Sequence, residues 1–341
     1  MSFWAGRRVL VTGGGGFIGA HVASLLVARG ARVTVTTGTR AAPERLAMLH
    51  ALGCERIGPI DLTGPEACAA ACRGQEAVLN LAHADGSVAF KRSRPAWIFR
   101  RNTVITLNML EAALAAGVER TLVVSSSEVY PAVATPPMTE SAAAAATLSD
   151  RADDGYAWSK RVSELAAQLY AREHAMKVAI ARPNNVYGPG DHFDAERSRV
   201  IPGLIRDVFA AADRITVWGS GEQVRTFLYV EDFARGALDL TERYAVGDPV
   251  NFGGEEEVTI LQLAEMVVRL SGRRLAVVCD PRKPAGSPRR TVDTTKAREV
   301  LGYRSSVPLE TGLRATIASY QENALRVPAE GTAATGAGQA R

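Results

Sequence analysis

The stretch Thr12–Gly19, written TGGGGFIG, comes directly after an apolar run and directly before a helical pattern. Between a strand and a helix, Gly13 permits a tight turn, Gly16 lets a phosphate approach the backbone, and Gly19 allows close helix packing. The unpaired N–H groups at the start of the helix would face that phosphate. The stretch therefore predicts a dinucleotide site, and the alternative is a glycine-rich connection that binds nothing. The cofactor-binding candidates here are Gly13, Gly16, Phe17, Ile18 and Gly19.

Short β-rich runs alternate with Ala- and Leu-rich helical stretches through the first half of the chain. The β-rich runs are mostly apolar, as expected of parallel strands that are covered on both faces. This alternation predicts a doubly wound α/β domain with a parallel, Rossmann-type sheet. The predicted strands span residues 7–13, 31–37, 54–62, 76–82, 120–127 and 177–183, and the helices between them span residues 17–30, 42–53, 64–74, 102–118 and 159–175.

The alternation stops after Pro183. A long polar loop follows, and the later segments predict a smaller α/β lobe. One helix–strand pair, residues 230–254, is expected to rejoin the main sheet. We therefore assign residues 1–183 and 223–253 to the main domain, residues 184–222 and 254–320 to the lobe, and residues 326–341, which lack periodicity, to a disordered tail.

The composition is that of a globular protein, with 47% hydrophobic and 22% charged residues in a chain of 341. The formal charge of +4 is small and does not indicate a nucleic-acid surface. No apolar run is long enough to cross a membrane and the start lacks a signal-peptide pattern, so we expect a cytoplasmic protein. Cys68 and Cys72 lie one helical turn apart without further ligands nearby, which favours reduced packing residues over a metal site.

The end of the second predicted strand lacks the acidic residue that holds a ribose 2′-hydroxyl in NAD sites. It reads VTTGTR, and its hydroxyls with Arg40 suit a 2′-phosphate better. This favours NADP, and NAD stays open because Arg40 could be a solvated loop charge. Asp61 and Leu62 follow the third strand and could meet the adenine ring, although Asp61 could instead cap the next helix.

Tyr156 and Lys160 lie four residues apart at the start of a predicted helix and therefore share one face. An unperturbed phenol has a pKa of ~10, too high for acid–base work at neutral pH. A neighbouring ammonium favours the phenolate and lowers that pKa. The pair therefore predicts a catalytic tyrosine, while an exposed helix face is the alternative for such a pair taken alone.

Taken together, these motifs resemble the extended short-chain dehydrogenase/reductase family, the NAD(P)-dependent epimerases and dehydratases of nucleotide sugars. The resemblance runs in order from residue 9 to about residue 315, and the later segments look most like GDP-L-fucose synthase. The matching stretches are TGGGGFIG at 12–19, NLAHADG at 80–86, NTVITLNMLEAA at 102–113, SSSEVYP at 125–131, YAWSK at 156–160, RPNNVYGPGD at 182–191, RTFLYVEDFARG at 225–236 and KAREVLGY at 296–303.

The resemblance implies a nucleotide diphosphate sugar as substrate, NAD or NADP as cofactor, and a homodimer. It implies that Ser126 hydrogen-bonds the reacting sugar oxygen, Tyr156 transfers its proton, and Lys160 binds the nicotinamide ribose. Paired guanidinium groups from the late basic segment would hold the diphosphate; a solvated basic loop is the alternative. The substrate-binding candidates are Ser126, Ser127, Asn185, Arg199, Trp218, Arg225 and Arg289, with Arg290 as the alternative to Arg289.

Two positions depart from GDP-L-fucose synthase. Glu128 stands where that group has a catalytic cysteine, and Arg199 stands where it has a catalytic histidine, so 3,5-epimerisation is in doubt. A glutamate at position 128 resembles the nucleotide-sugar dehydratases and decarboxylases, in which it acts on the sugar. The alternative is a Glu128 carboxylate bonded to backbone or to an arginine. We expect no metal.

The sequence thus predicts an enzyme that acts through a 4-keto sugar. C4 epimerisation is the first interpretation. The alternatives are a 4-keto-sugar reductase or epimerase-reductase that consumes NADPH, and a decarboxylase or dehydratase that uses Glu128. A non-catalytic NAD(P)-binding sensor is a further hypothesis, and the intact Ser126, Tyr156 and Lys160 argue against it.

Overall fold

A seven-stranded parallel sheet forms the centre of the computed structural model, which describes residues 2–145, 154–283 and 286–326. The strand order is β11-β6-β5-β4-β1-β2-β3, and every neighbouring pair is parallel. This confirms the predicted doubly wound fold, including the late strand that rejoins the sheet. The strands are β1 (Arg8–Thr12), β2 (Arg32–Thr36), β3 (Glu55–Ile57), β4 (Ala77–Asn80), β5 (Arg120–Val124), β6 (Val178–Pro183) and β11 (Pro249–Phe252).

Helices cover both faces of this sheet because successive side chains of a strand point to opposite faces. On β1, Val9 and Val11 join the core beneath helices α1 and α8, whereas Leu10 joins the core beneath α3 and α5. Helix α6 packs along α5 on this second face. The helices are α1 (Phe17–Ala28), α2 (Pro43–Ala51), α3 (Pro65–Cys72), α4 (Val88–Ser93), α5 (Pro95–Ala115), α6 (Gly155–His174), α8 (Val230–Arg243) and α10 (Thr295–Leu301).

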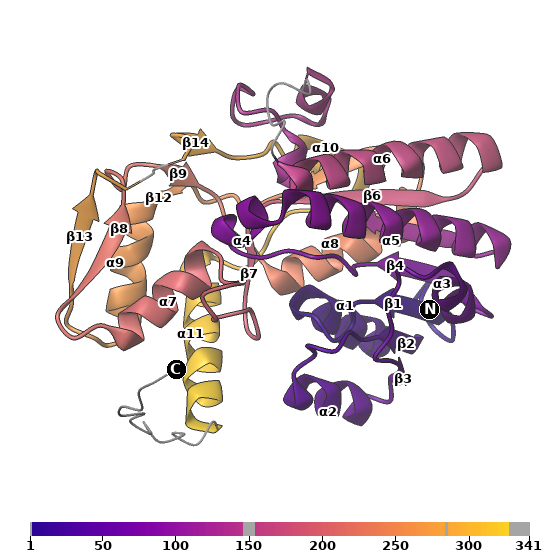
Figure 1. The fold of residues 1–341 in the computed structure, drawn as a ribbon, viewed down its shortest axis with the longest axis horizontal. Helices are drawn as coiled ribbons and strands as arrows, with labels where there is room; N and C mark the ends of the chain where they lie inside the picture. The colour runs from indigo at the N-terminus through magenta and orange to yellow at the C-terminus, as the bar shows by residue number, and fades with distance from the viewer. Residues whose placement is uncertain (1, 146–153, 284–285, 327–341) are drawn as a thin grey trace, which may run out of the picture.

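The smaller lobe lies beside the carboxyl end of the sheet, at the left in Figure 1. It has its own apolar core, in which α7, α9 and α11 pack around short strands. Its elements are β7 (Val186–Tyr187), α7 (Val200–Ala210), β8 (Arg214–Trp218), β9 (Val224–Arg225), β10 (Leu228–Tyr229), β12 (Val258–Thr259), α9 (Ile260–Leu270), β13 (Ala276–Asp280), β14 (Arg289–Arg290) and α11 (Leu309–Arg326).

The predicted division into a main domain and a lobe remains a prediction in its details. Ala297, Leu301 and Tyr303, assigned to the lobe from the sequence, pack into the core of the main sheet. Almost all of the predicted tail at 326–341 lies outside the described residues.

Cys68 and Cys72 are buried beneath α5. None of the helices in the described part of the chain is long and apolar enough for a membrane span.

Candidate active site

The glycine turn after β1 has the geometry that a dinucleotide site requires. Gly13 has a φ of 67°, and its carbonyl accepts a hydrogen bond from the Gly16 amide at 2.8 Å. A Cβ atom at Gly19 would lie 2.3 Å from the Gly13 oxygen, so only glycine fits where α1 meets the turn. Helix α1 then begins at Phe17 without an acidic residue in its first turn. Its unpaired N–H groups are therefore available to a phosphate.

A cavity of about 640 Å³ runs from this turn along the carboxyl ends of the strands. Such a position, where strand order reverses in a doubly wound sheet, is where these folds bind ligands. The walls bring together most of the residues that the sequence predicted for the cofactor and the substrate. These are Gly13, Gly16, Phe17, Ile18, Gly19, Arg40, Asp61, Leu62, Ser126, Ser127, Glu128, Tyr156, Asn185 and Arg199.

The adenosine end of this cavity is polar, and the residues there suit NAD(P). Arg40 is exposed and lines the cavity with Thr36, Thr37 and Thr39. The carboxylate of Asp61 pairs with Arg101 at 3.2 Å and accepts the Thr63 amide at 3.1 Å. Asp61 therefore closes a turn before α3 but does not cap that helix, whose N-cap is Gly64 without a side-chain bond; it still lines the cavity.

The catalytic candidates meet where β5 ends. The chain leaves the strand in extended backbone at Ser126 and turns into the 3-10 helix η1 (Ser127–Val129), with the Ser126 hydroxyl accepting the Glu128 amide at 3.1 Å. The Tyr156 side chain, 6% exposed, hydrogen-bonds Ser126. Ser127 instead donates to Asn184 at 2.9 Å. The structure therefore brings a hydroxyl and a phenol together at the cavity wall, and their catalytic roles remain predictions.

Lys160 lies one turn below Tyr156 and outside the cavity wall. Its ammonium donates to the Val124 carbonyl at 2.8 Å and is 5.6 Å from the centre of the Tyr156 ring. Burial lowers the pKa of Lys160 to about 8, against the opposing effects of Asp85 and Glu164. This ammonium is therefore close enough to favour a phenolate, and its charge titrates near neutral pH.

Burial raises the pKa of Tyr156 well above its ordinary value, and the nearby Asp85 adds to the effect. Arg199 and the bond to Ser126 oppose it. The sequence predicted that Lys160 lowers this pKa, but the lowering charge among the groups around the phenol is Arg199. A phenol with a high pKa keeps its proton at neutral pH, and a positive charge beside it is needed to make it an effective acid.

Glu128 faces the cavity and is held by an arginine from the lobe. A carboxylate oxygen of Glu128 lies 3.5 Å from the Arg290 guanidinium, which also donates to the Ser127 carbonyl at 2.9 Å. Its side chain is 32% exposed. This matches the interpretation of Glu128 as a carboxylate bonded to an arginine.

The sequence analysis did not predict that Asp85 lies near Tyr156. Asp85 pairs with Lys91 at 3.5 Å and with Arg199 at 3.9 Å, and these cations hold its pKa far below the ordinary range. The Lys91 ammonium lies 4.5 Å from the centre of the Tyr156 ring. Asp85 stands three residues after the end of the predicted strand 76–82, and this position was a usable signal. Lys91 lies on α4, which the sequence analysis did not predict.

Three predicted substrate residues do not line the cavity. Trp218, at the end of β8, is 59% exposed. Arg289 pairs with Glu257 at 2.6 Å on the surface, whereas its neighbour Arg290 turns toward Glu128. Arg225 is half-buried near Arg290 and donates to the Val224 carbonyl. Their substrate roles remain predictions.

The family model for the NAD dependent epimerase/dehydratase family matches residues 9–253, which span both the glycine turn and the Tyr156 site. The chain belongs to this family. Its membership confirms the resemblance drawn from the motifs and makes the chain an NAD(P)-dependent enzyme of nucleotide-sugar metabolism.

Relatives in the epimerase/dehydratase family differ in the reaction that they carry out. A dTDP-4-dehydro-6-deoxy-D-allose reductase of a Streptomyces species is 37% identical over 93% of this chain and 97% of its own. A probable GDP-L-fucose synthase of Oryza sativa subsp. japonica is 36% identical over 70% of this chain and 74% of its own. Among solved structures, the dTDP-glucose 4,6-dehydratase of Streptomyces venezuelae, with NAD bound, has 28% identity and a TM-score of 0.80 over 93% of this chain and 97% of its own.

Proposed function

We propose that this enzyme uses NADPH to reduce the C4 ketone of a dTDP-linked 4-keto-6-deoxy sugar. The proposal rests on the two positions where GDP-L-fucose synthase has its catalytic pair for epimerisation at C3 and C5. Glu128 is in an ion pair with Arg290, and Arg199 is a guanidinium beside Asp85. An arginine is not deprotonated in proteins and is no acid–base group. Tyr156 therefore remains as the proton donor at the sugar.

The proposed step needs one hydride and one proton. NADPH supplies the hydride to C4 when it is bound. Tyr156 gives its phenolic proton to the ketone oxygen, which Ser126 holds by a hydrogen bond. Arg199, the cation that lowers the pKa of Tyr156, stabilises the phenolate that forms, and the Lys160 ammonium, 5.6 Å from the ring centre, supports it. The raised pKa of Tyr156 means that the phenol begins each cycle protonated, and a neighbouring cation must favour the phenolate for the proton to leave.

The relatives support a reductase over the C4 epimerase that was our first interpretation. The reductase of the Streptomyces species matches across nearly its whole length, and a second, from Streptomyces bikiniensis, is 37% identical over 92% of this chain. A C4 epimerase would use the same Ser126, Tyr156 and Lys160 but would return the hydride to the sugar. It stays the second candidate because the same three side chains can serve both reactions.

The choice of NADPH rests on the loop after β2. Arg40 and three threonines line the cavity there, and no carboxylate follows β2 to repel a 2′-phosphate or to bond a 2′-hydroxyl. A location in the cytoplasm remains part of this proposal.

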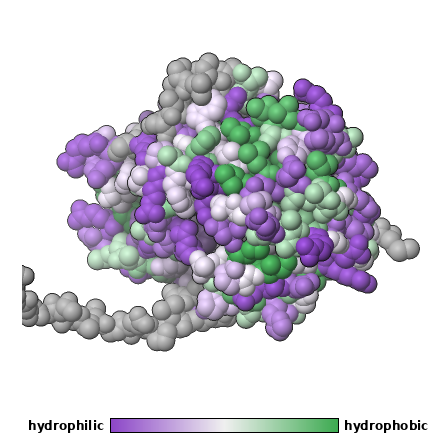
Figure 2. Space-filling model, turned by 45° about the vertical axis from the view of Figure 1, so that its right-hand side comes forward, coloured by the Kyte–Doolittle hydropathy of each residue, from purple (hydrophilic) through white to green (hydrophobic). Residues whose placement is uncertain are grey.

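A homodimer through α5 and α6 also belongs to the proposal. Leu107 on α5 is 39% exposed, and Leu165 and Leu169 on α6 are 55% and 45% exposed. Leu165 and Leu169 are one turn apart and share a face. Figure 2 shows hydrophobic side chains gathered in patches among hydrophilic ones on the surface. Exposed apolar patches of this kind mark interfaces.

The test is turnover of a dTDP-4-keto-6-deoxyhexose in D₂O. We expect oxidation of NADPH in a one-to-one ratio with the sugar that is reduced, and a product without deuterium at C3 or C5. Deuterium at either carbon would show epimerisation and would contradict our assignment of Glu128 and Arg199. Interconversion of two 4-hydroxy sugars without net use of NADPH would establish the C4 epimerase instead.

A further inference from the structure

One buried face of α6 carries three polar residues at four-residue spacing. Tyr156, Lys160 and Glu164 are 6%, 4% and 6% exposed. Residues spaced in this way line up along a helix. The opposing segment is the end of β5, Val124–Ser126, in which each of three consecutive residues contacts a different member of the helix face.

These contacts fix the helix against the strand end. The Lys160 ammonium donates to the Val124 carbonyl at 2.8 Å. The Ser125 hydroxyl donates to Glu164 Oε1 at 2.5 Å. Tyr156 hydrogen-bonds Ser126. The position of Ser126 relative to Tyr156 therefore depends on the bonds of Lys160 and of Glu164 to the strand end. Of these two side chains, Glu164 has no part in the proposed reaction.

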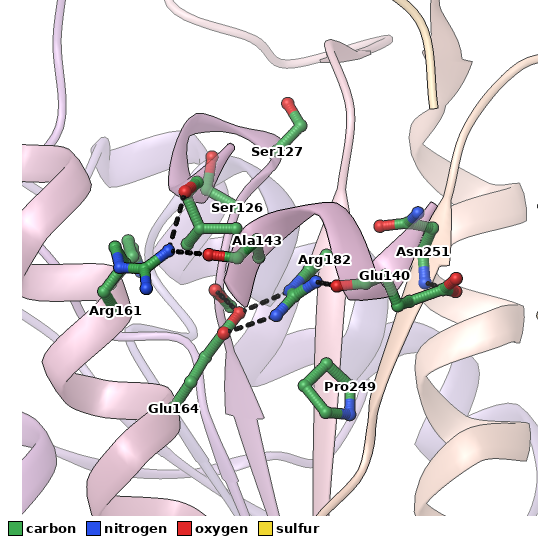
Figure 3. A network of polar contacts seen from close by, with 12 residues as sticks. Ser126, Ser127, Glu140, Ala143, Arg161, Glu164, Arg182, Pro249 and Asn251 are labelled. Carbon is green, nitrogen blue, oxygen red and sulfur yellow. Dashed lines mark hydrogen bonds and ion pairs between the residues drawn. The ribbon is translucent and has the colours of Figure 1, made fainter. Parts of the chain in front are cut away.

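Glu164 is held in turn by a buried arginine. Arg182 on β6 is 5% exposed at its side chain, and it donates from Nε to Oε1 and from Nη2 to Oε2, both at 2.7 Å. Figure 3 shows Glu164 reaching from α6 to this guanidinium, beneath the loop that bears Ser126. Such a two-pronged pair fixes the direction of both side chains.

The pair is anchored beyond α6 as well. The second terminal nitrogen of Arg182 donates to the Tyr130 hydroxyl at 3.1 Å and to the Glu140 carbonyl at 2.9 Å. The Tyr130 hydroxyl donates to Asn251 on β11 at 2.6 Å. Both ends of the catalytic turn, Ser125 and Tyr130, are thus bonded to one buried ion pair.

We propose that Glu164 is a positioning residue that, paired with Arg182, sets the distance between Ser126 and Tyr156 and maintains the charge of Lys160. The inference rests on the proposed reductase chemistry of these residues. It goes beyond that chemistry in assigning a role to a carboxylate that does not line the cavity.

Three charged groups act on the pKa of the Lys160 ammonium. Glu164 on its own helix and Asp85 after β4 favour the ammonium, while Lys91 on α4 opposes it. His83 stays neutral, because burial and Lys160 lower its pKa to about 4. Removing the Glu164 charge takes away one of two supporting carboxylates. The pKa of Lys160 then falls further from its ordinary value, and the alkaline limb of activity moves to lower pH.

The first experiment compares wild type with Glu164→Gln, which keeps an acceptor for Ser125. We expect kcat to fall about tenfold, as for a small misplacement of reacting groups, with little change in the KM for NADPH. We expect the alkaline limb of kcat to move down by about one pH unit. The control is Asp232→Asn, which removes a buried carboxylate of α8 bonded to Ser306 and should leave the limb unmoved.

A second readout needs no substrate. The chain has five lysines, Lys91, Lys160, Lys177, Lys283 and Lys296, so ¹³C-lysine labelling gives a short NMR spectrum in which Lys160→Arg identifies the Lys160 signal. The titration of that signal should shift to lower pH in Glu164→Gln. A Lys160 titration unchanged from wild type would overturn the charge role, even if the sugar substrate has been chosen wrongly.

Ser125→Ala tests the positioning role without leaving an unpaired charge, and it keeps the proposal testable if Glu164→Gln fails to fold. The variant should lower kcat and leave the Lys160 titration in place. Combined with Glu164→Gln, it should add little further loss, because both changes break the same bond. Wild-type kcat in Ser125→Ala would overturn the positioning role.

Discussion

Tyr156 combines burial, a bond to Ser126 and a nearby ammonium in one side chain. Tyr156→Phe removes only the ionisable oxygen, so the fold and the cofactor site should persist. General acid–base groups contribute about 10²–10⁴-fold to turnover, and we expect a loss in that range in steady-state assays of NADPH oxidation.

Tyr170 supplies the matched control. It lies on the same helix, bonds Glu111 at the surface and is not among the described residues that line the cavity. Tyr170→Phe should keep wild-type turnover. Should the Tyr156→Phe variant retain more than about a tenth of wild-type activity, Tyr156 is not the proton donor.

Asp191 is a buried carboxylate whose ionisation weakens the fold. It is 7% exposed, and among the described residues its Oδ2 has no hydrogen-bond partner. Burial and Asp85 raise its pKa to about 6, although Arg199 and Arg45 oppose them. Because this folded-state pKa lies above the ordinary aspartate value of 3.8, the folded protein binds the proton more tightly and gains stability as pH falls through 6 toward 4.

Asp191→Asn should therefore stabilise the protein above pH 6. We expect a gain of about 1–3 kcal/mol in the free energy of unfolding at pH 8, shrinking as pH approaches 4, measured by urea denaturation. Asp194→Asn in the same loop is the control. Arg197 and its backbone amide lower the pKa of Asp194, so this second change should not stabilise. A stability difference independent of pH would contradict the assignment.

The loop after β2 is the element that separates NADP from NAD. Arg40→Ala should weaken NADPH binding by about tenfold or more, since a charge-assisted bond to phosphate is lost, and should barely change NADH binding. Fluorescence titration of both cofactors measures this. Arg56→Ala removes an exposed arginine of β3 outside the cavity and should change neither. Equal losses for both cofactors in Arg40→Ala would exclude the 2′-phosphate contact.

Long, periodic elements could be predicted from the sequence, and short ones could not. The parallel strands and the glycine turn were predicted because apolar runs and turn residues are local signals. Helix α4 has six residues, too few to show a helical period, so Lys91 was missed. Arg289 and Arg290 are neighbours on β14, where side chains alternate between faces. Which one meets Glu128 depends on the pairing of β14 with β9, a contact that no local pattern encodes.

The site as a whole depends on contacts between distant segments. Asp85 and Arg199 lie far apart in the sequence, yet they surround Tyr156 together. The sequence predicted the hydroxyl, the phenol and the ammonium from spacing and resemblance. It offered an arginine partner for Glu128 only as an alternative. It predicted neither which arginine that is nor the ion pair at Arg199, because those partners come from the lobe and from another loop.

At the scale of the assembly, the α5–α6 surface carries the dimer proposal. The double change Leu165→Glu with Leu169→Glu places four charges across a symmetric interface and should give a monomer by light scattering after gel filtration. Val278→Glu alters an exposed apolar side chain of β13 in the smaller lobe, 43% exposed, and should leave the dimer intact. A wild-type monomer at all concentrations would refute the proposal.

Strand β11 completes the sheet beside β6, although it lies near the end of the main domain in the sequence. Since ribosomes synthesise proteins from the N-terminus, the glycine turn, Ser126 and Tyr156 emerge before the partners that hold the catalytic turn, Asn251 and Arg290. A nascent chain that stops before residue 249 presents β6 as an open edge, the kind of surface that chaperones and proteases meet first. Premature termination between residues 184 and 248 therefore yields a chain with every catalytic side chain and no finished catalyst.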